Sequence, residues 1–178
     1  MRGKGLLFIL ILGLFFNSSI VASESRSEYE VKANYLLTFL KYTECPGEVT
    51  EPLVISVLGE SPFDKYLQKF HGKKFNKRLV EVNYLSSLDE ALKIKHHHII
   101  FICSNLELRQ KTLLEKLTPK STLTIGDNKW FLSSEGMISF VLKGDKIRWK
   151  VNHKVIADRK VKISSQVLRL ALNKEGEL

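Results

Sequence analysis

The chain has 178 residues, enough for one domain with a sizeable core, and 28 Lys and Arg against 19 Asp and Glu give it a net charge of +9. The sequence lacks a helix-turn-helix signature, zinc-finger spacing and an aromatic-rich RNA-binding motif, so its charge does not indicate a nucleic-acid partner. The basic residues are spread along the chain, which predicts a solvated basic surface. An anionic membrane surface or an acidic protein face are the alternative partners for such a surface.

The first 23 residues have the pattern of a secretory signal. Arg2 and Lys4 provide a positive start, an uncharged apolar core runs from Leu6 to Phe16, and small residues follow. The apolar core is shorter than the ~20 residues that a spanning helix needs, so we expect cleavage and no stable membrane insertion afterwards; an uncleaved anchor is the alternative. We exclude residues 1–23 from the fold and expect residues 24–178 to form a single domain.

Apolar periodicity predicts alternating helices and strands along the rest of the chain. A wide apolar stripe at helical spacing predicts a buried helix over 27–42, with Ser27 and Glu30 as a capping box. The run 53–59 is almost continuously apolar, which is typical of a strand buried on both faces. The further elements expected in chain order are a helix over 62–71, a strand over 78–84, a helix from Ser86 or Ser87 to Lys93, a strand over 98–102, a helix over 105–117, a strand over 121–126, and a helix over 163–172 capped by Ser164 and Ser165.

Two alternating runs, 136–142 and 147–152, flank a Gly144-Asp145 turn and predict a β-hairpin. The order of elements predicts an α/β protein with three layers and a mainly parallel sheet, similar to flavodoxin or Rossmann folds. Helices are expected on both faces, and the hairpin is expected to add a C-terminal antiparallel edge.

In such a fold, ligands bind beyond the carboxyl ends of the strands. The loops expected there supply the candidate ligand-binding residues Gly59, Ser61, Ser104, Asn105 and Asp127. The same residue types also serve as helix caps and turn residues, so a purely structural role is the alternative. Because the sequence contains neither a G-x-G-x-x-G nor a P-loop motif, we expect no nucleotide and no cofactor.

The remaining reactive side chains do not form a recognisable centre. His96, His97 and His98 are adjacent, so their side chains alternate between faces, and we interpret them as the start of a strand and expect no metal site. Cys103 has no evident partner base and is interpreted as a strand-ending residue, not a catalytic nucleophile. Cys45 is expected near the opposite end of the sheet, so we predict that the two cysteines are unpaired. A disulfide is the alternative, because the count is even in an exported chain and the 43–52 loop could fold toward Cys103.

Several of these segments, in this order and spacing, resemble the YfiR-like family. The opening helix is similar to the family pattern K-A-x-[FY]-L-x-x-[FI]-x-[KR]-[FY]-x-x-W-P, and the hairpin with the segment after it is the strongest match. Cys45 stands where the pattern has Trp, and Lys160 stands where a Gly is common. The matching segments are Val31–Tyr42, Leu53–Gly59 with Pro62 and Phe63, His98–Ile102, Gly136–Phe140, Ile147–Asn152, Ile163–Ser165 and Leu168–Ala171.

The resemblance implies a periplasmic, non-enzymatic regulatory protein with a tendency to form dimers. It implies a membrane-bound signalling partner of the diguanylate cyclase or kinase type, and a role as a repressor that restrains cyclic-di-GMP signalling. Redox control through disulfides is not carried over, because the cysteines do not fall at the corresponding positions. The alternative hypothesis is a periplasmic small-ligand-binding protein that uses the loops at the carboxyl ends of the strands.

Overall fold

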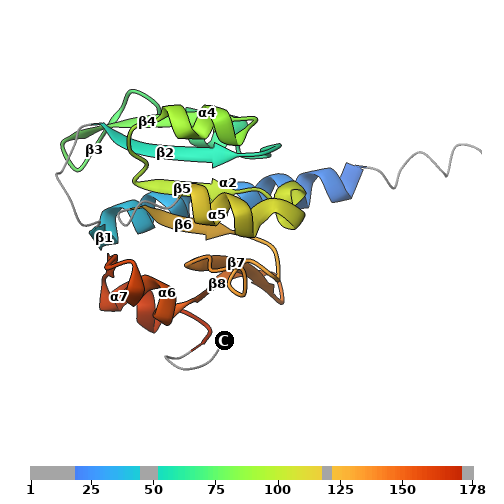
Figure 1. Cartoon of the computed structure of the whole chain (residues 1–178). Coiled ribbons are helices and arrows are strands. Elements are labelled where there is room, and N and C mark those ends of the chain that lie inside the picture. Colours follow the sequence, from blue (N-terminus) through green and yellow to red (C-terminus); the bar gives the residue numbers. More distant parts are fainter. Residues whose placement is uncertain (1–18, 45–51, 118–121, 174–178) are drawn as a thin grey trace, which may run out of the picture.

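The computed structural model describes residues 19–44, 52–117 and 122–173. Its centre is a seven-stranded sheet in the order β3-β4-β2-β5-β6-β7-β8 (Figure 1). The five inner strands are parallel, and β3 and β8 are antiparallel to their neighbours. The strands are β2 (Leu53–Leu58), β3 (Lys74–Phe75), β4 (Arg78–Leu85), β5 (Ile99–Ile102), β6 (Leu123–Gly126), β7 (Ile138–Lys143) and β8 (Lys146–Val151).

Helices cover both faces of the sheet, which confirms the predicted three-layer α/β architecture. Helices α2 (Ser19–Tyr42) and α3 (Asp64–Gln68) lie on one face. Helices α4 (Leu88–Lys93) and α5 (Gln110–Leu117) lie on the other, in front of the sheet in Figure 1. The strand-helix-strand connections therefore bury the inner strands from both sides, which explains why β2 and β5 consist almost entirely of apolar residues.

The larger core lies between the sheet and the face covered by α2 and α3, and its aromatic part lies between α2 and the C-terminal hairpin. Tyr35 and Phe39 of α2 contact Phe140 and Trp149, whose strands pair through the hairpin register. Aromatic pairs of this kind contribute ~0.5–1.5 kcal/mol each beyond their buried area. The opening helix and the hairpin, the two segments that most resemble the YfiR-like family, thus pack against each other through one aromatic cluster.

The predicted hairpin is confirmed. Lys143 pairs with Lys146 across a two-residue loop, and Gly144 adopts a φ of 62°, which suits glycine in a tight hairpin turn. The outer edge of β8 is covered by the segment that follows the last helix. The Asn173 side chain accepts from the Val151 N–H and donates to the Val151 carbonyl, both at 2.8 Å, and the Leu172 N–H donates to the Trp149 carbonyl.

Helix boundaries differ from the prediction in three places. Ser27 lies inside α2, so the predicted capping box is wrong; the segment contains no Gly or Pro to stop the helix, which begins at Ser19. The predicted signal cleavage point therefore falls within α2. The helix predicted over 62–71 is only α3, and the helix predicted over 105–117 begins as the 3-10 helix η1 (Ser104–Arg109) before α5.

The C-terminal region contains elements that the sequence did not indicate. Helix α6 (His153–Asp158) follows the hairpin directly, capped by the Asn152 side chain, which accepts from the Val155 N–H. The helix predicted over 163–172 begins later, because β9 (Lys162–Ile163) pairs with β1 (Thr43–Glu44) before α7 (Ser165–Arg169) begins, and the helix also ends earlier than predicted, at Arg169. The predicted Ser164 cap of this helix is confirmed, since its hydroxyl oxygen accepts from the Gln166 N–H.

Lys160, the residue found in place of the common Gly, has a φ of 58°. It ends the turn after α6, where its N–H donates to the Ala157 carbonyl. A left-handed backbone costs a residue with a Cβ ~1–2 kcal/mol, which glycine does not pay. The usual Gly therefore fits a conformation that this chain adopts with a lysine.

Candidate functional site

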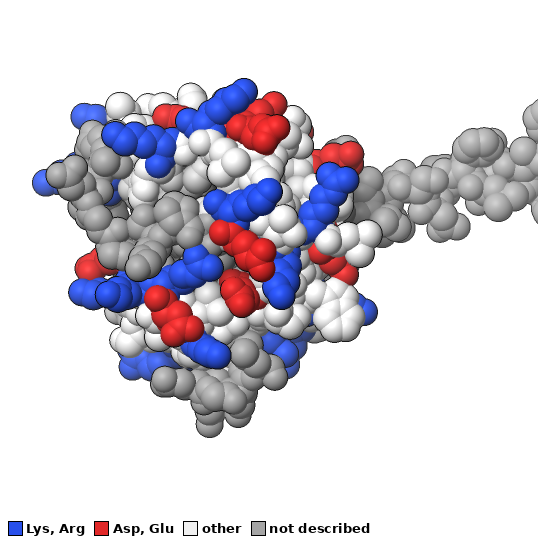
Figure 2. Space-filling view, in the orientation of Figure 1, with Lys and Arg blue, Asp and Glu red and all other residues white. Residues whose placement is uncertain are grey.

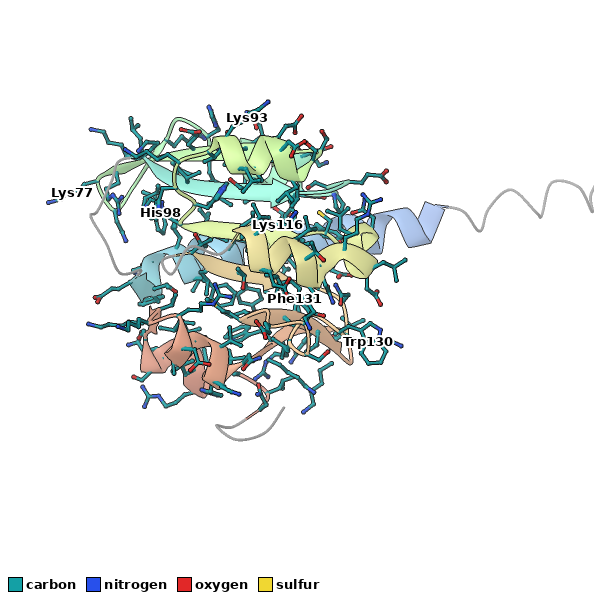
Figure 3. All side chains as sticks on the ribbon, in the orientation of Figure 1. Lys77, Lys93, His98, Lys116, Trp130 and Phe131 are labelled. Carbon is teal, nitrogen blue, oxygen red and sulfur yellow. The ribbon has the colours of Figure 1, made fainter. Side chains whose placement is uncertain are left out.

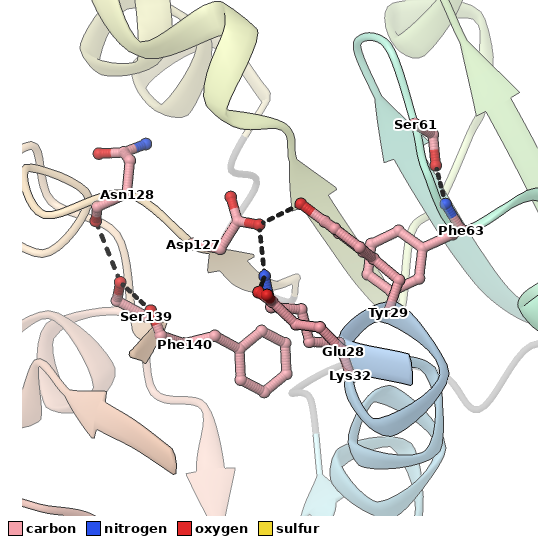
Figure 4. A network of polar contacts seen from close by, with 9 residues as sticks. All are labelled: Glu28, Tyr29, Lys32, Ser61, Phe63, Asp127, Asn128, Ser139 and Phe140. Carbon is pink, nitrogen blue, oxygen red and sulfur yellow. Dashed lines mark hydrogen bonds and ion pairs between the residues drawn. The ribbon is translucent and has the colours of Figure 1, made fainter. Parts of the chain in front are cut away.

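A buried polar network joins α2 to the carboxyl end of β6 (Figure 4). Asp127 follows β6, and its Oδ2 accepts from the Lys32 Nζ at 2.8 Å and from the Tyr29 hydroxyl at 2.9 Å. The side chains of Lys32 and Asp127 are only 4% and 6% exposed. Glu28 also pairs with Lys32 from one turn earlier in the helix. Two segments about 95 residues apart in sequence are thus joined by a charged pair removed from water.

The network lies against aromatic rings. Tyr29 packs edge-on against Phe63, which in turn packs edge-on against Phe101 of β5. Lys32 Nζ lies 4.3 Å from the centre of the Tyr29 ring, an arrangement typical of a cation–π contact. Burial and the neighbouring Asp127 carboxylate raise the pKa of the Tyr29 hydroxyl, which is therefore a hydrogen-bond donor at neutral pH.

The burial of this network determines what it can do chemically. Asp127 Oδ1 has no hydrogen-bond partner among the described residues, while Oδ2 receives two donors. A general acid or base must reach the proton that it transfers, and the Lys32 and Asp127 side chains are almost fully buried. The arrangement instead fixes the position of α2 on the sheet, since breaking such a pair would leave a buried charge uncompensated.

The loop residues predicted to bind a ligand lie at this end of the sheet, and several of them make contacts within the protein. Gly59 and Asn105 are in contact: a Cβ at Gly59 would lie 2.6 Å from Asn105 Oδ1, which accepts from the Glu60 N–H at 3.3 Å. Ser61 accepts from the Phe63 N–H within its own turn. Ser104 begins η1 and is exposed. Asp127 faces α2. Ligand binding by these five loop residues stays a prediction.

Sequence reasoning missed Lys32 and Tyr29. A signal was present, because Lys32 lies one turn before Leu36 and two before Phe39 and Leu40, within the apolar stripe that predicted burial. A lysine in a buried stripe requires an acidic partner. The partner, Asp127, was selected as a loop residue, but nothing in the sequence indicated that the two would meet.

The loop after Asp127 is fixed by a second polar cluster and by one aromatic ring. The Asn128 side chain donates to Gln110 Oε1 at 2.7 Å and accepts from the Trp130 N–H. Phe131 is fully buried against Gly126 and Gly136, where an added Cβ would lie 2.4 Å and 2.2 Å from its ring. Figure 3 shows Phe131 within the molecule and Trp130 projecting from its edge.

His96, His97 and His98 directly precede β5, and the last two make hydrogen bonds at its start. His97 is buried, with its Nδ1 2.8 Å from the Ser56 hydroxyl and its Nε2 3.1 Å from the Ala91 carbonyl. His98 Nδ1 accepts from the Val54 N–H, and burial, followed by His96 and Arg78, lowers the pKa of His98 to about 4. Across residues 19–44, 52–117 and 122–173, no group of three or more His, Cys, Asp or Glu side chains is placed to hold a metal ion.

Cys103 ends β5 as a buried free thiol. Burial, followed by the Asp127 carboxylate, raises the pKa of this thiol to about 12, so it is not a thiolate nucleophile at neutral pH. Cys45 lies outside the described residues, and its predicted unpaired state stays a prediction.

A cavity of about 300 Å³ opens beside the predicted ligand loops, on the face covered by α4 and α5. Its floor is formed by Leu58 at the end of β2 and Leu113 of α5, and its walls come from the β4–α4 turn and η1. A second cavity, of about 260 Å³, lies at the β1–β9 pair between Lys41 and Lys162. Neither cavity includes the residues selected from the sequence.

The surface carries exposed apolar side chains and mixed charge. Leu142 at the end of β7 is 65% exposed, and Val31 of α2, one turn before Tyr35, is also exposed. Leu92 of α4, on the other face of the sheet, is 54% exposed. On the face shown in Figure 2, Asp and Glu lie among the more numerous Lys and Arg, so that this face has no continuous positive patch. Among the described helices, none is long and apolar enough to cross a membrane.

Comparison with known proteins identifies the family. The family model described as YfiR/HmsC-like matches residues 29–172, which include Tyr29 and every element from β1 to α7. The chain belongs to the YfiR/HmsC-like family. Members of this family are periplasmic regulatory proteins, and they are not catalytic. The resemblance inferred from the opening helix and the hairpin is therefore confirmed.

Two solved structures share the fold. A conserved domain protein from Vibrio cholerae aligns with a TM-score of 0.55 at 8% identity, over 81% of this chain and 59% of the other. The ABC domain in complex with L-Trp from Streptococcus pneumonia aligns with a TM-score of 0.55 at 13% identity, over 79% of this chain and 59% of the other. Both chains are thus considerably longer than the matched region. A search of curated proteins finds no match.

Proposed function

We propose that this protein is exported to the periplasm and represses a membrane-bound signalling protein, of the diguanylate cyclase type, by binding its periplasmic part. The match of residues 29–172 to the YfiR/HmsC-like family carries this proposal, because that family is regulatory. The signal-like residues 1–23 support export. The repressor acts by binding one of two states of its partner more tightly, which shifts the population toward the inactive state.

The surface beside the aromatic cluster is the proposed contact with the partner. Leu142 lies two residues after Phe140 on the same strand, and Val31 lies one helical turn before Tyr35. Because Tyr35 contacts Phe140, the two exposed side chains lie at the same end of this α2–β7 contact. Neighbouring exposed apolar side chains mark a candidate surface for protein contact.

Partner capture tests the proposal. Tagged protein is expressed in cells that produce a membrane diguanylate cyclase, and both co-purification and cellular cyclic-di-GMP are measured. We expect the protein to retain the cyclase and to lower cyclic-di-GMP, and Leu142→Glu to remove both effects. Leu92→Glu is the matched control, since Leu92 is similarly exposed but lies on α4. If both variants lose cyclase binding equally, the proposed contact surface is wrong. If the unmodified protein neither retains the cyclase nor lowers cyclic-di-GMP, the proposed function is wrong.

Export is tested by mass spectrometry of the periplasmic fraction, and the single domain over residues 24–178 is tested by urea unfolding of the same product. The expected product begins at Glu24 or one residue earlier and unfolds in one cooperative transition. A full-length product retained with the membrane would instead indicate an uncleaved anchor. The proposed homodimer is tested by light scattering on the same material, which distinguishes a molecular mass of one chain from that of two.

A further inference from the structure

The cavity beside the ends of β2 and β4 has a chemistry that the proposed repressor role does not use. Its buried surface is aliphatic, with Leu58 and Leu113 at the floor and Leu88 and Leu106 in the walls. The described residues that line it include no aromatic side chain, so they offer no stacking surface for a planar ring. A volume of about 300 Å³ is at the lower end of the range for small-molecule sites. These features fit a short aliphatic chain.

Among the described residues, Arg109 is the cationic residue that lines this cavity, and hydroxyl groups lie beside it. The Arg109 guanidinium has no hydrogen-bond or ion-pair partner among the described residues. The Ser87 hydroxyl oxygen accepts from the Glu90 N–H, which leaves the hydroxyl proton available to another acceptor. The Glu90 carboxylate does not line the cavity and already accepts from the Ser86 N–H and hydroxyl.

The charge at the rim decides which head group the cavity accepts. Among the described residues, no carboxylate side chain lines it, so an ammonium group would meet Arg109 without a compensating partner from this part of the chain. A ligand carboxylate can instead form two parallel hydrogen bonds with the guanidinium and accept a third from Ser87. From these contacts we infer that the cavity binds a short aliphatic monocarboxylate, with its chain between Leu58 and Leu113 and its carboxylate on Arg109.

Binding of hexanoate, octanoate, octanol and octylamine to the purified protein, measured by calorimetry, tests this inference. Each methylene that enters the cavity strengthens binding about fourfold, so octanoate should bind ~15-fold more tightly than hexanoate. Octanol should bind at least tenfold more weakly than octanoate, because it lacks the charge that Arg109 recognises, and octylamine should not bind. Absence of saturable octanoate binding at millimolar concentrations overturns the inference.

Substitutions at the rim test whether the ligand binds in this cavity. Arg109→Gln should weaken octanoate binding about tenfold or more but leave octanol binding unchanged, whereas Lys116→Gln, an exposed cation of α5 outside the cavity, should change neither. Thr112→Phe adds a ring at the rim from an exposed position and should block both ligands. Octanoate binding that is insensitive to Arg109→Gln overturns the assignment, even if Thr112→Phe impairs folding. Because this test needs no signalling partner, its outcome is independent of the proposed repressor role.

Discussion

The Lys32–Asp127 pair should contribute far more to stability than its single ion pair would at a surface. Replacing Lys32 by Met leaves the Asp127 carboxylate buried with only the Tyr29 hydroxyl as a donor. Removing one partner of a buried pair costs ~3–5 kcal/mol, and we expect that range for Lys32→Met. Asp127→Asn should cost less, about 2 kcal/mol, because Glu28 still compensates Lys32 and the amide oxygen can still accept from Tyr29.

Urea unfolding of the two single variants and the double variant measures this coupling. The double variant buries no uncompensated charge, so its loss should fall short of the summed single losses by ~1–3 kcal/mol. Lys69→Met is the matched control: Lys69 pairs with Glu30 at 3.7 Å, but both side chains are about half exposed, so the cost should stay within ~0.5 kcal/mol. Additive losses, or a Lys32→Met cost no larger than that of the control, would refute the role of the pair in fixing α2.

Four further substitutions or conditions test separate parts of the structure. Lys160→Gly should raise the free energy of unfolding by ~0.5–1 kcal/mol in urea titrations, since relief of the left-handed backbone exceeds the entropy cost of glycine. Gly126→Ala should lower it by ~2–3 kcal/mol, because the new Cβ meets the buried Phe131 ring; a smaller effect would mean that the ring can move. In a Cys45→Ser background, Ellman's reagent should label Cys103 only after unfolding, and rapid labelling of the native protein would contradict its burial. Burial depresses the pKa of His98 to about 4 from its ordinary 6.5, so the unfolded chain binds the proton first; stability should therefore fall as the pH drops from 6.5 to 4, with a shallower slope in His98→Gln.

The sequence allowed the parallel sheet and the hairpin to be predicted because their signals are local. Continuous apolar runs indicate strands buried on both faces, as β2 and β5 are, and a Gly-Asp pair between alternating runs indicates a tight turn. The Ser87 cap of α4 was also readable, since a cap involves residues three apart; its hydroxyl oxygen accepts from the Glu90 N–H.

What the sequence did not predict depends on contacts between distant segments. Ile163 of β9 pairs with Thr43, and this pairing delays the start of the last helix. The candidate site shows the same limit, since Lys32 and Asp127 were each visible as unusual or functional residue types, but their meeting depends on where α2 crosses the sheet. The cavity beside Arg109 is lined mainly by leucines, and only the three-dimensional packing shows that they leave a space.

Backbone groups at the two edges of the sheet are hydrogen-bonded to side chains of the same chain, which affects self-association. Exposed strand edges invite pairing with another chain and are common starting points of aggregation. On one side, the Asn173 amide occupies both backbone groups of Val151 in β8. On the other side, the His71 ring accepts from the Val82 N–H of β4, next to the short β3 strand. With the edges closed in this way, contact with another protein depends on side chains and not on strand addition.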